Sequence, residues 1–176
     1  MEQVFEEWNI YAGKKQLKDR SIDFDRIKNN ALLKITAITG IRRCGKTSVL
    51  ILLQQLLSKR GIKVAYVNLE DGRIKNNKNV LDTLLKWFGD TGYLFLDEIT
   101  NIPDYESWLA RNHELLKESL HLIISSSRRN IVVPSKALRG RLFSFEMYPL
   151  SFKEYLNFKS IAFEKTTVGV GKIEKS

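Results

Sequence analysis

Eight consecutive residues, Gly40 to Thr47, match the phosphate-loop pattern G-x-x-x-x-G-K-[ST] at every fixed position. Glycines let the main chain wrap closely around a phosphate with its N–H groups pointing inward. Lys46 is expected to hold the β and γ phosphates, and the hydroxyl of Thr47 is an oxygen ligand of the kind that Mg²⁺ prefers. The residues predicted to contact nucleotide are Gly40, Ile41, Arg42, Arg43, Cys44, Gly45, Lys46, Thr47 and Ser48.

The variable positions of this loop allow more than one interpretation. Arg42 and Arg43 contribute backbone amides, and their side chains are expected to point to solvent. Cys44 lies beside a predicted helix N-terminus, which can lower a thiol pKa and make the group reactive. A small buried filler is the commoner role for such a cysteine. The simplest alternative for the whole stretch is a glycine turn with a surface lysine.

Two acids follow a second apolar run. In "YLFLDEI" four apolar residues, Tyr93 to Leu96, precede Asp97 and Glu98. A strand of this kind lies in the middle of a sheet and carries the acids to its carboxyl edge, where ligands bind in open α/β folds. Asp97 is expected to reach the Mg²⁺ shell, and Glu98 to polarise a water for attack on the γ-phosphorus. The alternative is a solvated acidic pair.

Two further groups of residues could assist nucleotide hydrolysis. Ser125 to Ser127 end another predicted strand, and Ser126 is selected as a polar sensor of the γ-phosphate, although serines are also ordinary turn residues. Arg139 and Arg141 could stabilise transition-state charge, in the site of another subunit if the protein assembles into rings or dimers. The alternative is that both are surface arginines.

Alternating patterns predict the elements that position these residues. Apolar, strand-like runs at residues 32–39, 62–69, 93–96, 120–127 and 142–150 are separated by segments with helical spacing. This order predicts βαβ crossovers and a mostly parallel, three-layer α/β sheet. We divide the chain into an N-terminal helical extension at 1–30, a core at 31–158 and a tail at 159–176 that lacks periodicity and is expected to be poorly ordered.

Composition restricts the protein class. The 176 residues carry a formal net charge of +9 with 43% hydrophobic residues, which fits one globular domain and polyanionic partners such as nucleotides, nucleic acid or acidic protein surfaces. The single cysteine cannot form an internal disulfide, which suits a reducing compartment. The N-terminus does not resemble a signal peptide, and no apolar run approaches the roughly 18 residues of a membrane span. We expect a cytoplasmic protein with no membrane partner.

The chain resembles a known family over about Leu32 to Phe158. "GIRRCGKTSVL", "VNLED", "YLFLDEITNIPDYESWL" and "LRGRLFSFEMYPLSFKEYL" are similar to AAA-type P-loop ATPases of archaea and bacteria, which are often joined to a C-terminal nuclease-like domain of unknown function. The resemblance implies an ASCE/AAA-like sheet with strand order 5-1-4-3-2, ATP as nucleotide, and Arg141 as arginine finger, in trans in a homo-oligomer. Only 18 residues follow Phe158, too few for the helical lid and the extra domain of family members, which suits an excised or truncated ATPase core.

The leading hypothesis is an Mg²⁺-dependent ATPase that binds ATP and ADP. A second hypothesis, of another class, is a nucleotide-gated module that binds nucleic acid or a protein partner and hydrolyses little ATP alone. A kinase acting on a small molecule is a third, less favoured because the Asp-Glu pair suits activation of water better than of a substrate hydroxyl.

Overall fold

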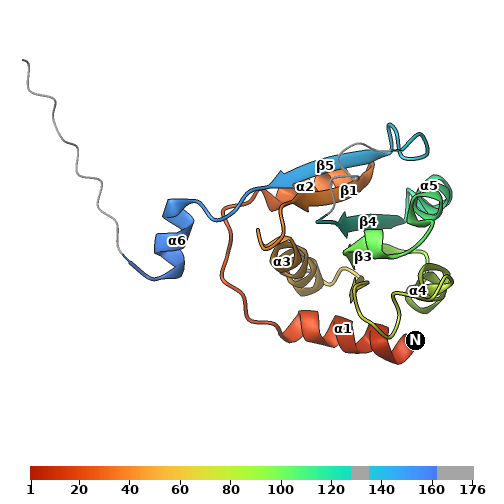
Figure 1. Ribbon diagram of the computed structural model, residues 1–176, viewed down its shortest axis with the longest axis horizontal. Coiled ribbons are helices and arrows are strands. Elements are labelled where there is room, and N and C mark those ends of the chain that lie inside the picture. Colours follow the sequence, from red (N-terminus) through yellow and green to blue (C-terminus); the bar gives the residue numbers. More distant parts are fainter. Residues whose placement is uncertain (128–134, 162–176) are drawn as a thin grey trace, which may run out of the picture.

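The computed structural model describes residues 1–127 and 135–161, and its ribbon is shown in Figure 1. The helices are α1 (Glu2–Lys14), α2 (Phe24–Ala31), α3 (Lys46–Lys59), α4 (Val80–Phe88), α5 (Tyr105–Leu116) and α6 (Phe152–Phe158). The strands are β1 (Ile35–Gly40), β2 (Val64–Asn68), β3 (Gly92–Asp97), β4 (Leu120–Ser125) and β5 (Leu142–Met147). A 3₁₀ turn, η1 (Ile99–Asn101), follows β3.

The five strands form one parallel sheet in the order β2-β3-β4-β1-β5. The order places β1 beside β4, so the strand that precedes the loop is separated by one strand from the strand that precedes the acids. Read from the other edge, this is the expected order 5-1-4-3-2, and the predicted three-layer α/β fold is confirmed. All five carboxyl ends meet at one edge of the sheet because every neighbouring pair is parallel.

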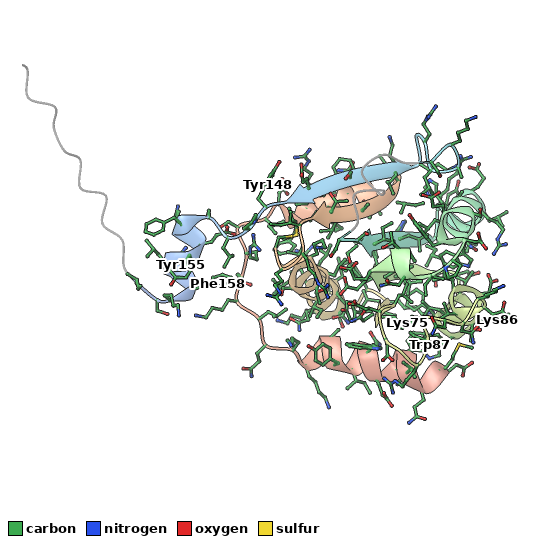
Figure 2. All side chains as sticks on the ribbon, viewed as in Figure 1. Lys75, Lys86, Trp87, Tyr148, Tyr155 and Phe158 are labelled. Carbon is green, nitrogen blue, oxygen red and sulfur yellow. The ribbon has the colours of Figure 1, made fainter. Side chains whose placement is uncertain are left out.

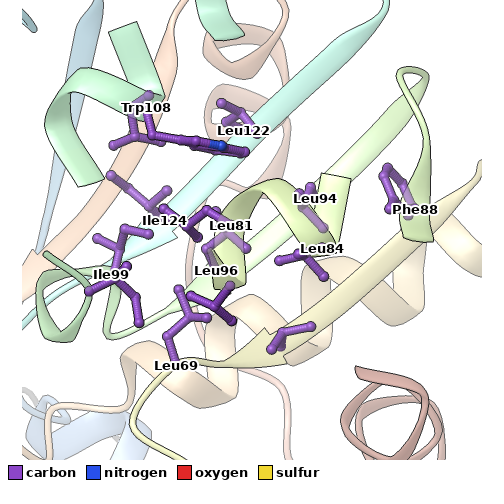
Figure 3. Packing of buried hydrophobic residues seen from close by; sticks show 14 of the residues in the cluster. Leu69, Leu81, Leu84, Phe88, Leu94, Leu96, Ile99, Trp108, Leu122 and Ile124 are labelled. Carbon is purple, nitrogen blue, oxygen red and sulfur yellow. The ribbon is translucent and has the colours of Figure 1, made fainter. Parts of the chain in front are cut away.

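Helices cover both faces of the sheet, and the strand alternation assigns the residues to each face. Leu94 and Leu96 face α4 and α5, where they pack with the α4 and α5 side chains in Figure 3. Tyr93 and Phe95, the residues between, face the opposite layer with α2 and α3. The buried strands are therefore apolar on both faces, as expected for a parallel sheet between two helical layers.

Helix α1 lies across the β2 edge of the sheet (Figure 1). Its Phe5 is buried in the cluster on the α4 side and its Ala12 in the cluster on the α3 side. The indole N–H of Trp8 donates to Asp71 Oδ2 at 2.9 Å, which ties the helix to the segment after β2. The helix thus covers a strand that would otherwise be an exposed edge.

Several element boundaries differ from the sequence prediction for local reasons. Residues 32–34, predicted as strand, instead close a turn in which Leu33 and Lys34 donate their N–H groups to Asn30 O. Strand β5 ends at Met147 rather than 150, and α6 begins with a capping box between Ser151 and Glu154. Most of the predicted tail, residues 162–176, lies outside the described residues. Among the described helices, none is long and apolar enough to cross a membrane.

Candidate functional site

The loop between β1 and α3 has the backbone conformation that its glycines allow. Gly40 and Gly45 have φ of 140° and 98°, values that favour glycine. A Cβ on Gly40 would lie 2.3 Å from Met147 O, so the loop also approaches the end of β5 too closely for a side chain. Helix α3 begins at Lys46, and its first-turn N–H groups have no partner within the helix. The loop and this helix end form a concave surface suited to an anion.

Lys46 is folded into the loop. Its ammonium donates to Gly40 O at 3.1 Å and to Ile41 O at 3.0 Å, and only 4% of the residue is exposed. A buried ammonium needs hydrogen-bond acceptors, and here the loop carbonyls supply them. A phosphate with its negative charge is a stronger acceptor than these carbonyls, so the same group could turn to it.

Strand register brings Asp97 to the loop. Side chains alternate along β3, so Asp97 lies on the same face as Tyr93 and Phe95, the face covered by α3. There Thr47, in the first turn of α3, donates its hydroxyl to Asp97 Oδ2 at 2.7 Å. Two motifs 50 residues apart in sequence therefore meet at one point.

Asp97 is 1% exposed and accepts two further hydroxyl groups. Tyr66, on β2, donates to Oδ2 at 2.8 Å, and Ser125, at the end of β4, donates to Oδ1. Burial raises the pKa of Asp97 above its usual range, the three hydroxyl donors oppose this, and the charge of Glu98 adds to the rise. Burial and the nearby carboxylate also raise the pKa of Tyr66, so this hydroxyl keeps its proton and donates.

Glu98 lies in a strained turn immediately after β3. Its φ of 54° is in the left-handed region, which non-glycine residues adopt rarely and mostly where the surroundings enforce it. Its backbone N–H donates to Ser125 Oγ at 3.0 Å. The carboxylate accepts the N–H of Ser127 at 3.1 Å and also the Ser127 hydroxyl. Both residues at the end of β4 therefore fix Glu98 in place.

A cavity of about 370 Å³ opens at this edge of the sheet. Its lining comes from the loop and the first turn of α3, from Asn68 at the end of β2 and Glu70 after it, and from Asp97, Glu98 and Ser127. The described residues contain no group of three or more His, Cys, Asp or Glu side chains that could hold a metal alone. Thr47 and Asp97 nevertheless offer adjacent oxygen atoms, and Mg²⁺ usually takes one or two protein oxygens together with phosphates and water.

The other predicted residues lie in different places. Arg42 and Arg43 line the cavity, and Arg42 is exposed, with its guanidinium 3.9 Å from Glu70. Cys44 is 3% exposed and packs in the α3-side core, as a filler would. Ser126 is buried with its hydroxyl 3.0 Å from that of Thr100, whereas the serine that lines the cavity is Ser127.

Arg141 lies at the opposite edge of the sheet. It precedes β5, whose first residue pairs with Ile35 and whose last residue pairs with Gly40. A strand of this length separates Arg141 from the loop of its own chain by on the order of 15–20 Å. Its guanidinium contacts Ala137 O at 3.1 Å and Glu114 at 3.3 Å.

Fold and site together define the class: an AAA-type P-loop nucleotide-binding module. The chain belongs to the family described as the AAA domain, which matches residues 33–156. An uncharacterized protein of Methanocaldococcus jannaschii, MJ1544, is 32% identical over 170 residues, and an uncharacterized protein of Haemophilus influenzae is 27% identical over 138 residues. The matches cover 93% and 72% of this chain but only 36% and 34% of those proteins. The chain thus spans about a third of their length.

Solved structures share the fold at low sequence identity. DnaA from Aquifex aeolicus bound to AMPPCP aligns with a TM-score of 0.52 and 19% identity, over 80% of this chain and 52% of that one. A replication initiator DnaA bound to AMPPCP and single-stranded DNA aligns with a TM-score of 0.54, also at 19% identity, over 80% and 50%. At this identity the likeness establishes the fold of the present chain.

Sequence reasoning gave no role to Tyr66 or Arg20, and it chose Ser126 over Ser125 and Ser127 as the sensor. Tyr66 looks like one more apolar residue of β2, and only the Asn68↔Asp97 register shows that it lies beside the acid. Ser125 and Ser127 were recognised as a polar strand end, but their separate partners follow from the turn at Glu98. Arg20 donates to Cys44 O from a segment with no strong pattern, and no sequence signal could have found it.

Proposed function

We propose that this chain is the core of an Mg²⁺-dependent ATPase. Lys46 and the loop amides would hold the β and γ phosphates, while Thr47 and Asp97 would hold the metal with phosphate oxygens and water. The metal would neutralise charge that develops on the phosphates. The observation that carries the proposal is the 2.7 Å contact between Thr47 and Asp97, with Glu98 lining the same cavity.

Glu98 would act on the attacking water. A carboxylate at this position accepts a proton from water as it attacks the γ-phosphorus in line with the leaving group. Each oxygen of a carboxylate can accept more than one hydrogen bond, so Glu98 can keep its Ser127 contacts while it also binds water. The Ser127 contacts would then orient the base rather than block it.

The experiment that tests this proposal measures ATP binding and phosphate release on the same sample. A Glu98→Gln variant should bind MgATP within about threefold of the parent and lose turnover by about a thousandfold, since general-base catalysis supplies factors of this order. Glu118→Gln, an exposed change before β4, is the matched control and should leave both quantities unchanged. Equal turnover in Glu98→Gln and parent would exclude Glu98 as the base.

A second candidate function is a nucleotide-gated module with negligible turnover alone. The observation that favours it is that two donors of Ser127 already occupy the Glu98 carboxylate. The net charge of +9 suits a polyanionic partner. Phosphate release measured with and without single- and double-stranded DNA or RNA separates the two: partner-dependent turnover supports the module, and partner-independent turnover supports the ATPase.

An arginine finger would have to come from another subunit. The position of Arg141 at the amino edge excludes a contact with the loop of its own chain. In a ring or dimer, this edge could face the site of a neighbouring copy. If so, turnover per chain should rise with protein concentration, and Arg141→Ala should remove that rise without weakening ATP binding.

A further inference from the structure

Arg20 packs against the outer side of the phosphate loop. Its Nη1 donates to Cys44 O at 2.8 Å, and its side chain is only 8% exposed. A Cβ on Gly45 would lie 2.8 Å from the same Nη1, so the guanidinium rests directly on the loop backbone. Arg20 belongs to the segment between α1 and α2 and is not part of the phosphate-loop motif.

The contact constrains one particular peptide. In a trans peptide the C=O and the N–H point in opposite directions. When Arg20 holds the carbonyl of Cys44 on the outside, the N–H of Gly45 in the same peptide is directed to the other side of the loop. A charged donor on the carbonyl also polarises the peptide and strengthens its N–H as a donor.

Glu154, in the first turn of α6, holds Arg20 in turn. Its Oε1 accepts Arg20 Nε at 2.9 Å and the N–H of Ser21 at 3.3 Å. Its Oε2 accepts the N–H of Ser151 at 2.9 Å and belongs to the capping box that starts α6. Burial alone would raise the pKa of Glu154, but the Ser151 and Arg20 donors lower it overall. The carboxylate is therefore ionised and fully used in these contacts at neutral pH.

The third contact of Arg20 reaches the segment between β5 and α6. Its Nη2 donates to Tyr148 O at 3.3 Å. Figure 2 shows Tyr148 where β5 ends, and Tyr155 and Phe158 on α6, which projects beyond the sheet. One side chain thus connects the phosphate loop to the end of β5 and to the first turn of α6. Helix α6 is also attached to the body of the protein by its buried Leu156 and by Lys18, which donates to Phe158 O.

We propose that Arg20 is a positioning residue for phosphate binding and that Glu154 makes its action depend on the placement of α6. The proposal rests on the proposed function, since it requires a phosphate in the loop. With α6 docked, Arg20 orients the Cys44–Gly45 peptide and the loop binds phosphate tightly. When α6 is displaced, Arg20 loses its anchor and phosphate affinity falls.

The test measures equilibrium binding of MgATP and of inorganic tripolyphosphate to the whole chain, at a temperature where circular dichroism shows every variant folded. Arg20→Ala should weaken both ligands about tenfold, the effect of losing one hydrogen bond to a charged group. Arg20 also lines a neighbouring cavity of about 340 Å³, which the adenine of ATP could enter. Tripolyphosphate has no adenine, so a loss of its affinity reports on phosphate binding alone. Arg20→Lys, which keeps the charge, should recover part of the loss.

Arg111→Ala is the matched control. Arg111 forms an exposed ion pair with Asp82 at 3.0 Å on the other side of the sheet, so its removal should leave both affinities unchanged. The dependence on α6 is tested with Glu154→Ala, which should weaken binding about threefold in the parent. The same change should have no further effect in the Arg20→Ala background, because Glu154 acts through Arg20.

Equal tripolyphosphate affinity in Arg20→Ala and parent would overturn the positioning role and leave the ATPase proposal intact. An undiminished Glu154→Ala effect in the Arg20→Ala background would overturn the coupling to α6. A parent chain that binds neither ligand would overturn the proposed function and this inference together. A shift of the Gly45 amide resonance in Arg20→Lys, without change at α4 or α5, would support the assigned peptide directly.

Discussion

The phosphate loop and the acidic end of β3 form two halves of one site that are built in different ways. The loop is mostly local: eight consecutive residues supply its backbone and its ammonium, and the ammonium donates to carbonyls of the same loop. The acidic end is built from segments that are distant in sequence, because hydroxyl groups from α3, from β2 and from the end of β4 bind Asp97 and Glu98. The difference indicates that the groups expected to contact phosphate come from one segment, which Arg20 supports from outside, whereas turnover depends on how the strands are aligned.

After Glu98→Gln, Asp97→Asn should give the largest effect on the acidic half. The change removes a charge that would hold Mg²⁺, and we expect turnover to fall by about a hundredfold. The amide nitrogen of Asn cannot accept the hydroxyl groups that now donate to one Asp97 oxygen, so some loss of stability is expected as well. The measurement is phosphate release together with ADP affinity in EDTA, which should stay near that of the parent. Asp90→Asn, before the amino end of β3, is the control.

A loss of metal-free ADP binding in Asp97→Asn would contradict the division into two halves. It would mean that the acid supports the loop itself and not only the metal. Melting temperatures of parent and variant, measured alongside, identify a general loss of folding.

Ser127→Ala should have an intermediate effect. It removes the hydroxyl donor to Glu98 but keeps the backbone N–H, so the carboxylate loses one of its two contacts with this residue. We expect turnover to fall about tenfold with MgATP affinity unchanged, since misplacement of a base affects the chemical step. The comparison with Ser126→Ala shows which serine serves the site, and a larger loss in Ser126→Ala would favour that residue as the sensor. Ser119→Ala, before the amino end of β4, is the control.

Tyr66→Phe should have the smallest effect. It removes one hydroxyl from Asp97 Oδ2 while the Thr47 donor to the same oxygen remains. We expect the Mg²⁺ concentration for half-maximal turnover to change about threefold, with a stability loss of about 1 kcal/mol for the lost hydrogen bond. Tyr93→Phe, the same change on the same sheet face at the amino end of β3, should leave the Mg²⁺ dependence unaltered. Identical Mg²⁺ titrations for both variants would remove Tyr66 from the site.

Local features of the molecule could be predicted from the sequence, whereas contacts between distant segments could not. The succession of strands and helices along the chain, and with it the parallel sheet, follows from hydrophobic periodicity. The eight-residue pattern predicts its own loop because its glycines and lysine lie within one short segment. Tyr66, Ser127 and Arg20 depend on which residues of different strands and segments lie side by side, and no local pattern encodes this. Residues 32–34 were wrongly predicted as strand because the apolar run of β1 begins already in the turn that closes on Asn30.

The central claim is that the loop binds nucleotide phosphates, and a titration of MgATP against the parent chain and Lys46→Ala tests it most directly. The parent should bind saturably with one site, and Lys46→Ala should weaken binding by about a hundredfold, the effect of losing a buried cation with two or more charged hydrogen bonds. Lys59→Ala, at the other end of α3, should bind as the parent does. Equal affinity in parent and Lys46→Ala would contradict the account.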